Sequence, residues 1–323
     1  MNERIVVCIC TRGRPKLFSE CLASVKRAYI PDGYDVSILV IDNNDEASSE
    51  VQTACEEAWP DVYYDHEARA GLSLARNCAL RGARGLNADW IAFIDDDERA
   101  DAVWLVEFMT AIEKHSQVTR WECSYCGKPH AWPVDAAHGV IEYEFPSDAP
   151  AWRCRDPWGK WGDVDGKHLN CAGTGNVIFR ASKARGLCFD EAQNTSGGED
   201  TKFFQRFHHE RGGRIVLSLY ATVTETVTWD RITLQGHAKK AFRNGVHKIE
   251  LSHMKRSKAI KQTVKRTLTG LWLLAMTPLA FVAGKDRALK IMLTGVLKLS
   301  EAAGTAAAVC GRSFNYYAKT TGQ

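Results

Sequence analysis

The first hundred residues alternate short apolar runs with segments of helical periodicity. The apolar runs predict three buried strands, at 5–10, 36–41 and 90–94. Between them, helical spacing of apolar residues predicts helices that begin near Pro15, Ser49 and Gly71. Strands that alternate with helices form right-handed crossovers, so we expect a Rossmann-like α/β fold with a mostly parallel sheet flanked by helices.

Each predicted strand ends in polar or acidic residues, namely Thr11-Arg12, Asp42-Asn43 and Asp95-Asp96-Asp97. The carboxyl ends of parallel strands share one edge of a sheet, and open α/β sheets bind ligands there. The pattern therefore predicts a binding site at this edge.

The middle of the chain is less regular. Periodicity fails between about 118 and 170, a stretch with five of the ten tryptophans, which could be core, sugar-stacking or membrane-interface residues. Beyond it, a glycine-led strand at 173–180, a helix from Gly197 to His209 and two strands, near 214–219 and 221–225, are predicted.

The last third changes in composition. Six basic residues and no acidic one lie between His253 and Arg266, and residues 267–284 carry no charge. This segment is short for a membrane span and contains Pro278. A soluble core helix is an alternative, but an interfacial or re-entrant helix pair on anionic lipid fits the composition best, with a second helix at 288–310.

The composition of the 323 residues is that of a globular protein, and a net charge of +3 does not favour nucleic acid as a partner. Eleven scattered cysteines and an N-terminus unlike a signal peptide predict a reducing, cytoplasmic location. Cys123, Cys126 and His130 have half of a zinc-site spacing, and no second pair completes it.

The triple carboxylate at 95–97 is the sharpest chemical signal. Alternation at a strand end would let Asp95 and Asp97 converge while Asp96 leans away. Converging carboxylates favour a divalent cation, Mn²⁺ or Mg²⁺, and substrate phosphates would complete the coordination shell of that cation. The alternative is an acidic turn that caps the next helix.

Four further residues have two interpretations each. Asp42 and Arg69 could bind the imide and carbonyl groups of uracil, or be ordinary loop residues. Glu199 and Asp200 could cap a helix, or supply a general base that deprotonates an acceptor hydroxyl.

Taken together, the chain resembles the family 2 glycosyltransferases of the GT-A fold, more narrowly the bacterial exopolysaccharide enzymes of the succinoglycan-glucosyltransferase type. The resemblance rests on an ordered set of motifs, at 7–15, 40–44, 70–77, 93–98, 173–176 and 197–200. It implies inverting transfer from a nucleoside-diphosphate sugar, usually UDP-linked.

The resemblance also implies residue roles. Asp95 and Asp97 would hold the metal, and Asp200, with Glu199 as its rival, would be the catalytic base. The donor and acceptor would contact the remaining positions: Thr11, Arg12, Asp42, Arg69, Asp96, Gly175, Asn176, Arg231 and Arg243.

These inferences predict a glycosyltransferase domain over 1–250 and a basic, amphipathic helical extension over 251–323 that associates with the membrane. The expected enzyme is peripheral on the inner face of the plasma membrane. It would extend a glycan carried on a polyprenyl diphosphate. A non-catalytic sugar- or nucleotide-binding scaffold and a nucleotidyltransferase are the alternatives.

Overall fold

The computed structural model describes residues 2–58, 60, 62–116, 121–122, 129–130, 133–154, 162–193, 197–252 and 256–311. The described chain divides into two compact units. The first contains residues 2–142 and 162–225, and the second contains 143–154 and 226–311.

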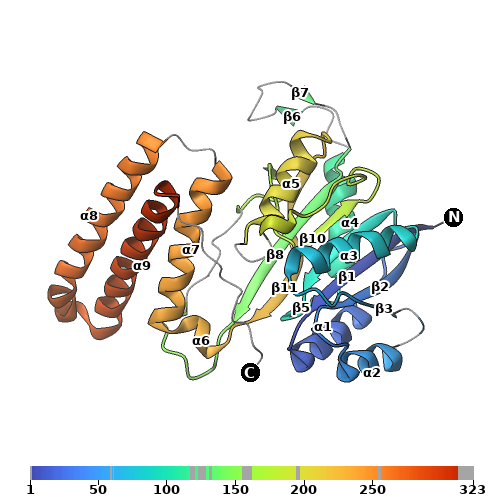
Figure 1. The fold of residues 1–323 in the computed structure, drawn as a ribbon, viewed down its shortest axis with the longest axis horizontal. Coiled ribbons are helices and arrows are strands. Elements are labelled where there is room, and N and C mark those ends of the chain that lie inside the picture. Colours follow the sequence, from blue (N-terminus) through green and yellow to red (C-terminus); the bar gives the residue numbers. More distant parts are fainter. Residues whose placement is uncertain are drawn as a thin grey trace. The chain divides into compact units, whose positions relative to one another are not determined.

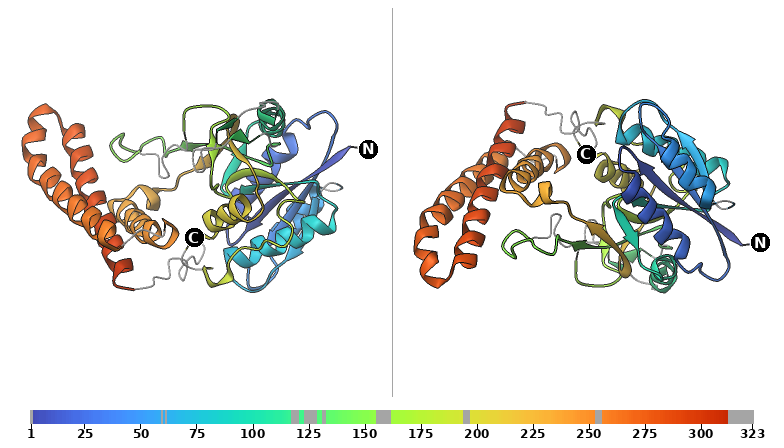
Figure 2. Two further views of the ribbon diagram at one scale, coloured as in Figure 1. Left: turned by 90° about the horizontal axis from the view of Figure 1, so that it is seen from above. Right: turned by 90° about the horizontal axis from the view of Figure 1, so that it is seen from below.

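The first unit is built on a mixed sheet with helices on both faces (Figures 1 and 2). Its parallel half has the order β3-β2-β1-β4. These strands are β1 (Glu3–Thr11), β2 (Tyr34–Asp42), β3 (Val62–His66) and β4 (Trp90–Asp95). The helices of this half are α1 (Pro15–Arg27), α2 (Ser49–Ala58), α3 (Leu72–Gly85) and α4 (Trp104–Ser116). The predicted α/β fold is confirmed.

The sheet continues beyond β4 with antiparallel strands in the order β10-β8-β11-β5. They are β5 (Glu98–Ala100), β8 (Ala136–Glu144), β10 (Asn176–Arg180) and β11 (Ile215–Thr226), with β9 (His168–Leu169) beside β11. A two-stranded sheet pairs β6 (Trp121–Glu122) with β7 (Pro129–His130). The short helix η1 (Glu191–Gln193) precedes α5 (Glu199–His209).

Two expectations in this half are corrected. β8 lies inside the stretch that was predicted to be irregular. Its polar, glycine-containing sequence gives no clear strand pattern, and pairing with β10 and β11 defines the strand. The two strands predicted at 214–219 and 221–225 are one continuous strand, β11, because Tyr220 stays in the extended ladder.

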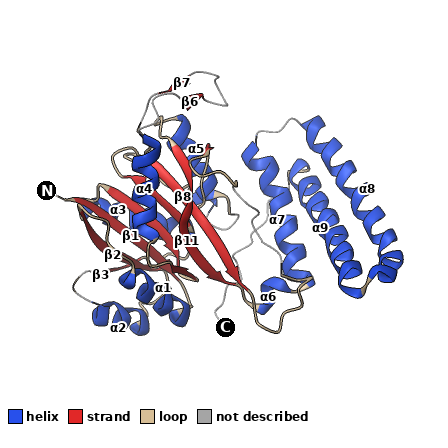
Figure 3. Cartoon of the chain, turned by 180° about the vertical axis from the view of Figure 1, so that it is seen from behind, coloured by secondary structure: helices blue, strands red, loops and turns tan. Residues whose placement is uncertain are grey.

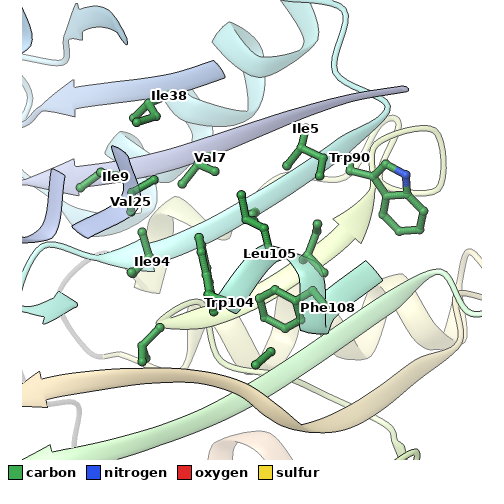
Figure 4. Packing of buried hydrophobic residues seen from close by; sticks show 14 of the residues in the cluster. Ile5, Val7, Ile9, Val25, Ile38, Trp90, Ile94, Trp104, Leu105 and Phe108 are labelled. Atoms are coloured by element: carbon green, nitrogen blue, oxygen red, sulfur yellow. The ribbon is translucent and has the colours of Figure 1, made fainter. Parts of the chain in front are cut away.

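Alternating side chains of the sheet divide the core into two layers. Ile5, Val7 and Ile9 of β1 face α1, α2 and α4, while Val6 and Cys8 face α3 and α5. Figure 4 shows the first layer, in which Trp104 and Phe108 of α4 pack under β1 and β4. Core residues therefore cover both faces of β1, and the layers position its carboxyl end within the sheet.

The second unit is helical (Figure 3). It contains α6 (Trp229–Ile232), α7 (Leu234–Ser252), α8 (Arg256–Ala280), η2 (Phe281–Ala283) and α9 (Lys285–Val309). α9 packs against both α7 and α8. Glycines permit this close approach: a Cβ at Gly304 would lie 2.0 Å from the carbonyl oxygen of Phe242, and one at Gly270 would lie 3.0 Å from that of Gly295.

One helix of the described chain, spanning Arg256–Ala283, is long and apolar enough to cross a membrane by length and composition. Its most apolar window has a mean hydropathy of 1.3 and is 11% buried. The contact-based division places α7 with the C-terminal helices. The predicted functional boundary at residue 250 stays a prediction.

Candidate active site

The carboxyl ends of β1, β2 and β4 lie side by side. Thr11 pairs with Asp42 in the β1–β2 ladder, and Cys10 pairs with Asp95 in the β1–β4 ladder. Neighbouring strands are about 4.8 Å apart. The sequence-based prediction that these polar ends share one edge of the sheet is confirmed.

The three aspartates after β4 have different partners. β4 ends at Asp95, and Asp96 and Asp97 form a turn. Asp96 is 1% exposed and accepts a hydrogen bond from the Thr11 hydroxyl at 2.8 Å. The guanidinium of Arg14 lies 3.1 Å from Asp96 and 2.7 Å from Asp97. The expected alternation of faces does not extend past Asp95, because a turn replaces the strand there. In this turn, Asp96 and Asp97 both contact the guanidinium of Arg14.

Burial dominates the electrostatics of this turn. It raises the pKa of Asp96 to about 7, although Arg14 and the Thr11 hydroxyl favour the charged form. Burial also raises the pKa of Asp95, whose side chain nevertheless keeps 47% of its surface exposed. Asp95 is therefore the more accessible carboxylate of the two.

Arg76 of α3 connects the end of β4 with the start of α5. Its side chain is 5% exposed, with Nη1 2.5 Å from Glu199 Oε1 and Nη2 3.5 Å from Asp95 Oδ1. Burial raises the pKa of both carboxyl groups, and Arg76 opposes both shifts. A single buried cation thus joins two predicted acidic positions that are far apart in the chain.

The start of α5 is shaped by two glycines and an aromatic stack. Gly197 and Gly198 have φ angles of 80° and 87°, in the left-handed region that favours glycine. Phe203 of α5 stacks on Phe189 with ring centroids 4.3 Å apart. The helix therefore begins at a fixed place, with Glu199 4% exposed and its Oε2 buried without a hydrogen-bond partner among the described residues.

Asp200, the predicted base, is half-buried beside Glu199. Its Oδ1 accepts hydrogen bonds from the backbone N–H and the hydroxyl of Thr201. Within the described chain, its Oδ2 has no hydrogen-bond partner. The charge of Asp200 raises the pKa of Asp95 and opposes the lowering of the His138 pKa to about 4, which burial causes. An available carboxylate oxygen therefore lies within electrostatic reach of Asp95.

Gly175 packs directly on the acidic turn. A Cβ at this position would lie 2.6 Å from Glu98 Oε1 and 3.4 Å from Asp95 Oδ2. Glu98 is 2% exposed and accepts a hydrogen bond from the backbone N–H of Asp95 at 3.0 Å. Burial raises the Glu98 pKa well above its ordinary range. A side chain at 175 would therefore press on the Glu98 carboxyl group and contact that of Asp95.

Asn176 is fully buried beside Gly175. Its amide donates to the carbonyl oxygens of Val140 and Ala221, each at 2.9 Å, and its Oδ1 accepts from Trp104 Nε1 at 2.8 Å. These bonds use both of its amide hydrogens, which favours a role in joining β10 to β8, β11 and α4. Substrate binding by Asn176 stays a prediction.

Asp42 is likewise engaged by the protein. Its two oxygens accept four hydrogen bonds, from the backbone N–H groups of Asn44 and Ser48, the Asn44 amide and the Tyr64 hydroxyl. This arrangement stabilises the loop after β2. Recognition of uracil by the Asp42 carboxylate would have to replace one of these bonds, and it stays a prediction.

The two predicted substrate-binding arginines of this edge have acidic neighbours. Arg69 is 64% exposed and forms a bidentate pair with Glu67 at 2.8 Å, which lowers the Glu67 pKa. Arg12 lies 3.0 Å from Asp45 and also donates to the carbonyl oxygen of Asn43. Both are surface pairs that a phosphate or a base could compete with.

Some predicted residues lie elsewhere. Arg231 is in α6 and Arg243 is in α7, both in the second unit, so their approach to the diphosphate stays a prediction. Cys123 and Cys126 of the possible zinc site lie outside the described residues. The cysteines in the described ranges are free thiols.

Comparison with known proteins settles the family. The family model of glycosyl transferase family 2 matches residues 6–185, which contain β1 to β4 and the acidic turn. The chain belongs to the family 2 glycosyltransferases.

Relatives of this glycosyltransferase agree with that assignment. It is 30% identical over 243 residues to the succinoglycan biosynthesis protein ExoM of Rhizobium meliloti, across 73% of this chain and 71% of ExoM. It is similar to the structure of S. aureus TarS 1–349 in complex with UDP-GlcNAc, with a TM-score of 0.51, 14% identity, and 97% of this chain and 93% of that chain covered. Against a longer TarS chain the TM-score is 0.50, and the chain spans 55% of that protein's length. The likeness shows the GT-A fold.

The acidic turn of this family 2 glycosyltransferase supplies only a few carboxylate oxygens to a possible metal ion. Among the described residues, no group of three or more histidine, cysteine, aspartate or glutamate side chains is arranged to hold a metal ion. Asp95 and Asp97 provide carboxylate oxygens, which suit Mg²⁺ or Mn²⁺ when substrate phosphates supply further ligands. Asp95 Oδ2 has no hydrogen-bond partner in the described chain, whereas Asp97 is paired with Arg14. The donor set fits a cation that binds together with its substrate.

Three site residues escaped the sequence analysis. Arg14, Arg76 and Glu98 all lie within or beside the family motifs, but their partners are distant in sequence or are backbone groups. For Arg76 the sequence did offer a signal. Arg76 lies among Leu74, Ala75 and Ala79, which are core residues of the amphipathic helix α3, so its charge is expected to be buried.

Proposed function

We propose that this glycosyltransferase is an inverting enzyme that moves a sugar from a UDP-linked donor to a hydroxyl of a glycan acceptor in bacterial exopolysaccharide or other cell-surface polysaccharide assembly. The observation that carries this proposal is the juxtaposition of Asp95 with the Glu199-Asp200 pair across Arg76. The UDP-GlcNAc complex of TarS and the name of ExoM support the donor and the pathway class.

The donor is proposed to bind at the carboxyl ends of β1, β2 and β4. Thr11, Arg12, Asp42 and Arg69 would contact the nucleotide, with Asp96 near the ribose. Asp95 and Asp97 would hold a divalent cation on the diphosphate, and the cation when bound would stabilise charge on the departing UDP. Arg14 would exchange part of its contact with Asp97 for a phosphate oxygen.

Asp200 is proposed to act as the general base. Its Oδ2 would accept the proton of the acceptor hydroxyl while that oxygen forms the new bond to the anomeric carbon. The bond from that carbon to UDP breaks in the same step, so the configuration inverts and no enzyme nucleophile is needed. Glu199 is held by Arg76 and is therefore better suited to positioning than to proton transfer.

The second unit supports a lipid-linked acceptor, because one face of α8 suits a membrane surface. Between Ile260 and Trp272, the large apolar side chains of α8 that are at least 49% exposed recur at i, i+4, i+8, i+11 and i+12, which is one helix face. We call this face the apolar stripe: Ile260, Val264, Leu268, Leu271 and Trp272. Exposed lysines accompany it at 258, 261 and 265. This composition suits an interfacial helix on anionic lipid, on the inner face of the plasma membrane.

The proposal is tested by measuring UDP release from a panel of UDP-sugars by purified protein with Mn²⁺. We expect metal-dependent hydrolysis or transfer with one donor, and its loss in Asp97→Ala. Binding of UDP-sugars without any turnover, with or without membrane acceptor, would instead support a non-catalytic scaffold. Release of diphosphate from UTP and a sugar 1-phosphate, with no release of UDP from UDP-sugars, would support a nucleotidyltransferase.

A further inference from the structure

A groove of about 460 Å³ lies between α3 and α5 in the first unit. Two arginines of α3 line one wall, Arg81 and Arg84, and two cations of α5 line the other, Lys202 and Arg206. Phe189 lines the groove, and the Arg76 guanidinium lies over its ring, 5.8 Å from the centroid, but the groove is not lined by Arg76 or by the residues proposed to bind the donor. The groove is therefore distinct from the proposed donor site.

Two of the four cations of the groove are only loosely neutralised. Lys202 lies 3.8 Å from Asp190, and Arg81 lies 3.8 Å from the buried Glu67, whereas Arg206 pairs with Glu210 at 3.0 Å. Exposed ion pairs of this kind contribute about 0–1 kcal/mol each, so an incoming anion would replace them at little cost. The walls carry four cationic side chains and two anionic ones, Asp190 and Glu191.

One arginine of the groove has an unused donor. Arg84 donates through Nη2 to the carbonyl oxygens of Ala184 and Leu187, at 2.9 and 3.3 Å. Its Nε is buried and has no hydrogen-bond partner among the described residues. Burial lowers the pKa of Arg84, and an anion in the groove would relieve that cost.

We propose that this groove binds a diphosphate group. Two phosphates side by side can accept hydrogen bonds from the arginines of α3 and from the cations of α5 at the same time. The source that the fold favours is the diphosphate of a lipid-linked acceptor, an assignment that rests on the proposed function. α5 carries both Asp200 and Lys202, roughly 3 Å apart along the helix axis and about 200° apart around it, so the base and the groove lie on different sides of one helix.

Cys188 provides a direct readout, because this exposed thiol lines the groove. Its alkylation by neutral N-ethylmaleimide is followed by mass spectrometry, with the exposed Cys310 as the internal reference. The full chain is treated with inorganic diphosphate, UDP or farnesyl diphosphate. EDTA is present throughout, so that metal-assisted binding at the proposed donor site does not contribute. We expect diphosphates to slow alkylation of Cys188 at least fivefold relative to Cys310.

Paired variants separate the groove from general charge. Arg81→Ala with Lys202→Ala removes one exposed cation from each wall and is expected to abolish protection. Arg27→Ala with Arg211→Ala removes two exposed arginines that do not line the groove, and it is expected to leave protection unchanged. Sulfate at equal ionic strength is the control for nonspecific anion effects.

The outcomes distinguish the ligand's source from the site itself. Stronger protection by farnesyl diphosphate than by inorganic diphosphate or UDP supports the lipid-linked source, whereas equal protection assigns the site to free diphosphates. Absent protection, equal protection by sulfate, or protection that survives Arg81→Ala/Lys202→Ala overturns the site. Because no donor or turnover is needed, failure here leaves the transferase assay of the proposed function untouched.

Discussion

At the scale of single residues, Arg76 is the side chain on which the candidate site depends. It is almost fully buried and has carboxylates on two sides, from β4 and from α5. Removing one member of a buried ion pair costs about 3–5 kcal/mol, because it leaves an unpaired charge in the interior. The pair with Glu199 is thus a testable link between α3 and α5.

We predict that Arg76→Met lowers the free energy of unfolding by about 3 kcal/mol. Glu199→Gln in the same chain should restore part of this loss, because the buried negative charge is removed as well. Urea denaturation of both single variants and the double variant measures the coupling. Strictly additive changes would show that the two side chains do not interact.

A second prediction at this scale concerns the base. Asp200→Asn keeps the size of the side chain and its contact with Thr201, but the amide cannot take up a proton. We expect UDP-sugar affinity to change less than threefold and kcat to fall by about 10²–10⁴-fold. Calorimetric titration and a transfer assay measure the two quantities. Equal losses of binding and turnover would reject Asp200 as the base.

At the scale of elements, α8 has a buried face and an exposed face that differ in composition. Its buried face has small residues, Ala259, Gly270 and Thr277, which allow close packing in the helical unit. Its exposed face carries the apolar stripe. A soluble helix normally exposes polar residues on this side, so the stripe indicates a further apolar partner.

We predict that Leu268→Glu with Trp272→Glu weakens binding to vesicles of phosphatidylglycerol and phosphatidylcholine at least tenfold. Each side chain contributes about 1.5–3 kcal/mol when it leaves water, and the new carboxylates are repelled by anionic lipid. Co-sedimentation measures the bound fraction. Ile30→Glu, at an exposed apolar residue of the first unit, is the matched control. A wild-type chain that stays in the supernatant contradicts the membrane proposal.

At the scale of the first unit as a folded whole, buried histidines make stability depend on pH. Burial lowers the pKa of His168 and of His138 to about 4, and it also lowers that of His208. The rings of His168 and His208 lie 4.9 Å apart. The unfolded chain, with ordinary histidine pKa values near 6.5, binds more protons than the folded chain. This histidine contribution to stability is therefore retained above about pH 6.5 and lost as the pH falls toward 4.

We predict that the histidine contribution to the free energy of unfolding decreases from pH 6.5 to pH 5, by up to about 1.4 kcal/mol per pH unit for each such histidine, while the raised pKa values of Asp96 and Glu98 act in the opposite direction. His168→Gln should flatten this slope, whatever its effect on stability at neutral pH. Urea unfolding at a series of pH values provides the measurement. The buried carboxyl groups with raised pKa values are the same in both chains, so the difference between the two slopes isolates His168, and an unchanged slope would show that His168 does not contribute.

The sequence alone determined the parallel half of the fold and the edge where chemistry was expected. Apolar runs at β1, β2 and β4 are long and regular, so local patterning was enough to predict the strands. The proximity of their polar ends followed from topology, because the carboxyl ends of parallel strands share one edge of the sheet. The ordered motifs were enough to indicate the family, which the comparisons confirmed.

Only the tertiary structure decided which carboxylates have cationic partners and which strands complete the sheet. β8 exists because β10 and β11 pair with it, and the Arg14 and Arg76 contacts join positions 83 and 123 residues apart in the chain. Burial, which sets the pKa values of Asp96 and Glu98, is likewise a property of packing. Such contacts leave no periodic signal in a sequence, because they depend on where distant segments meet.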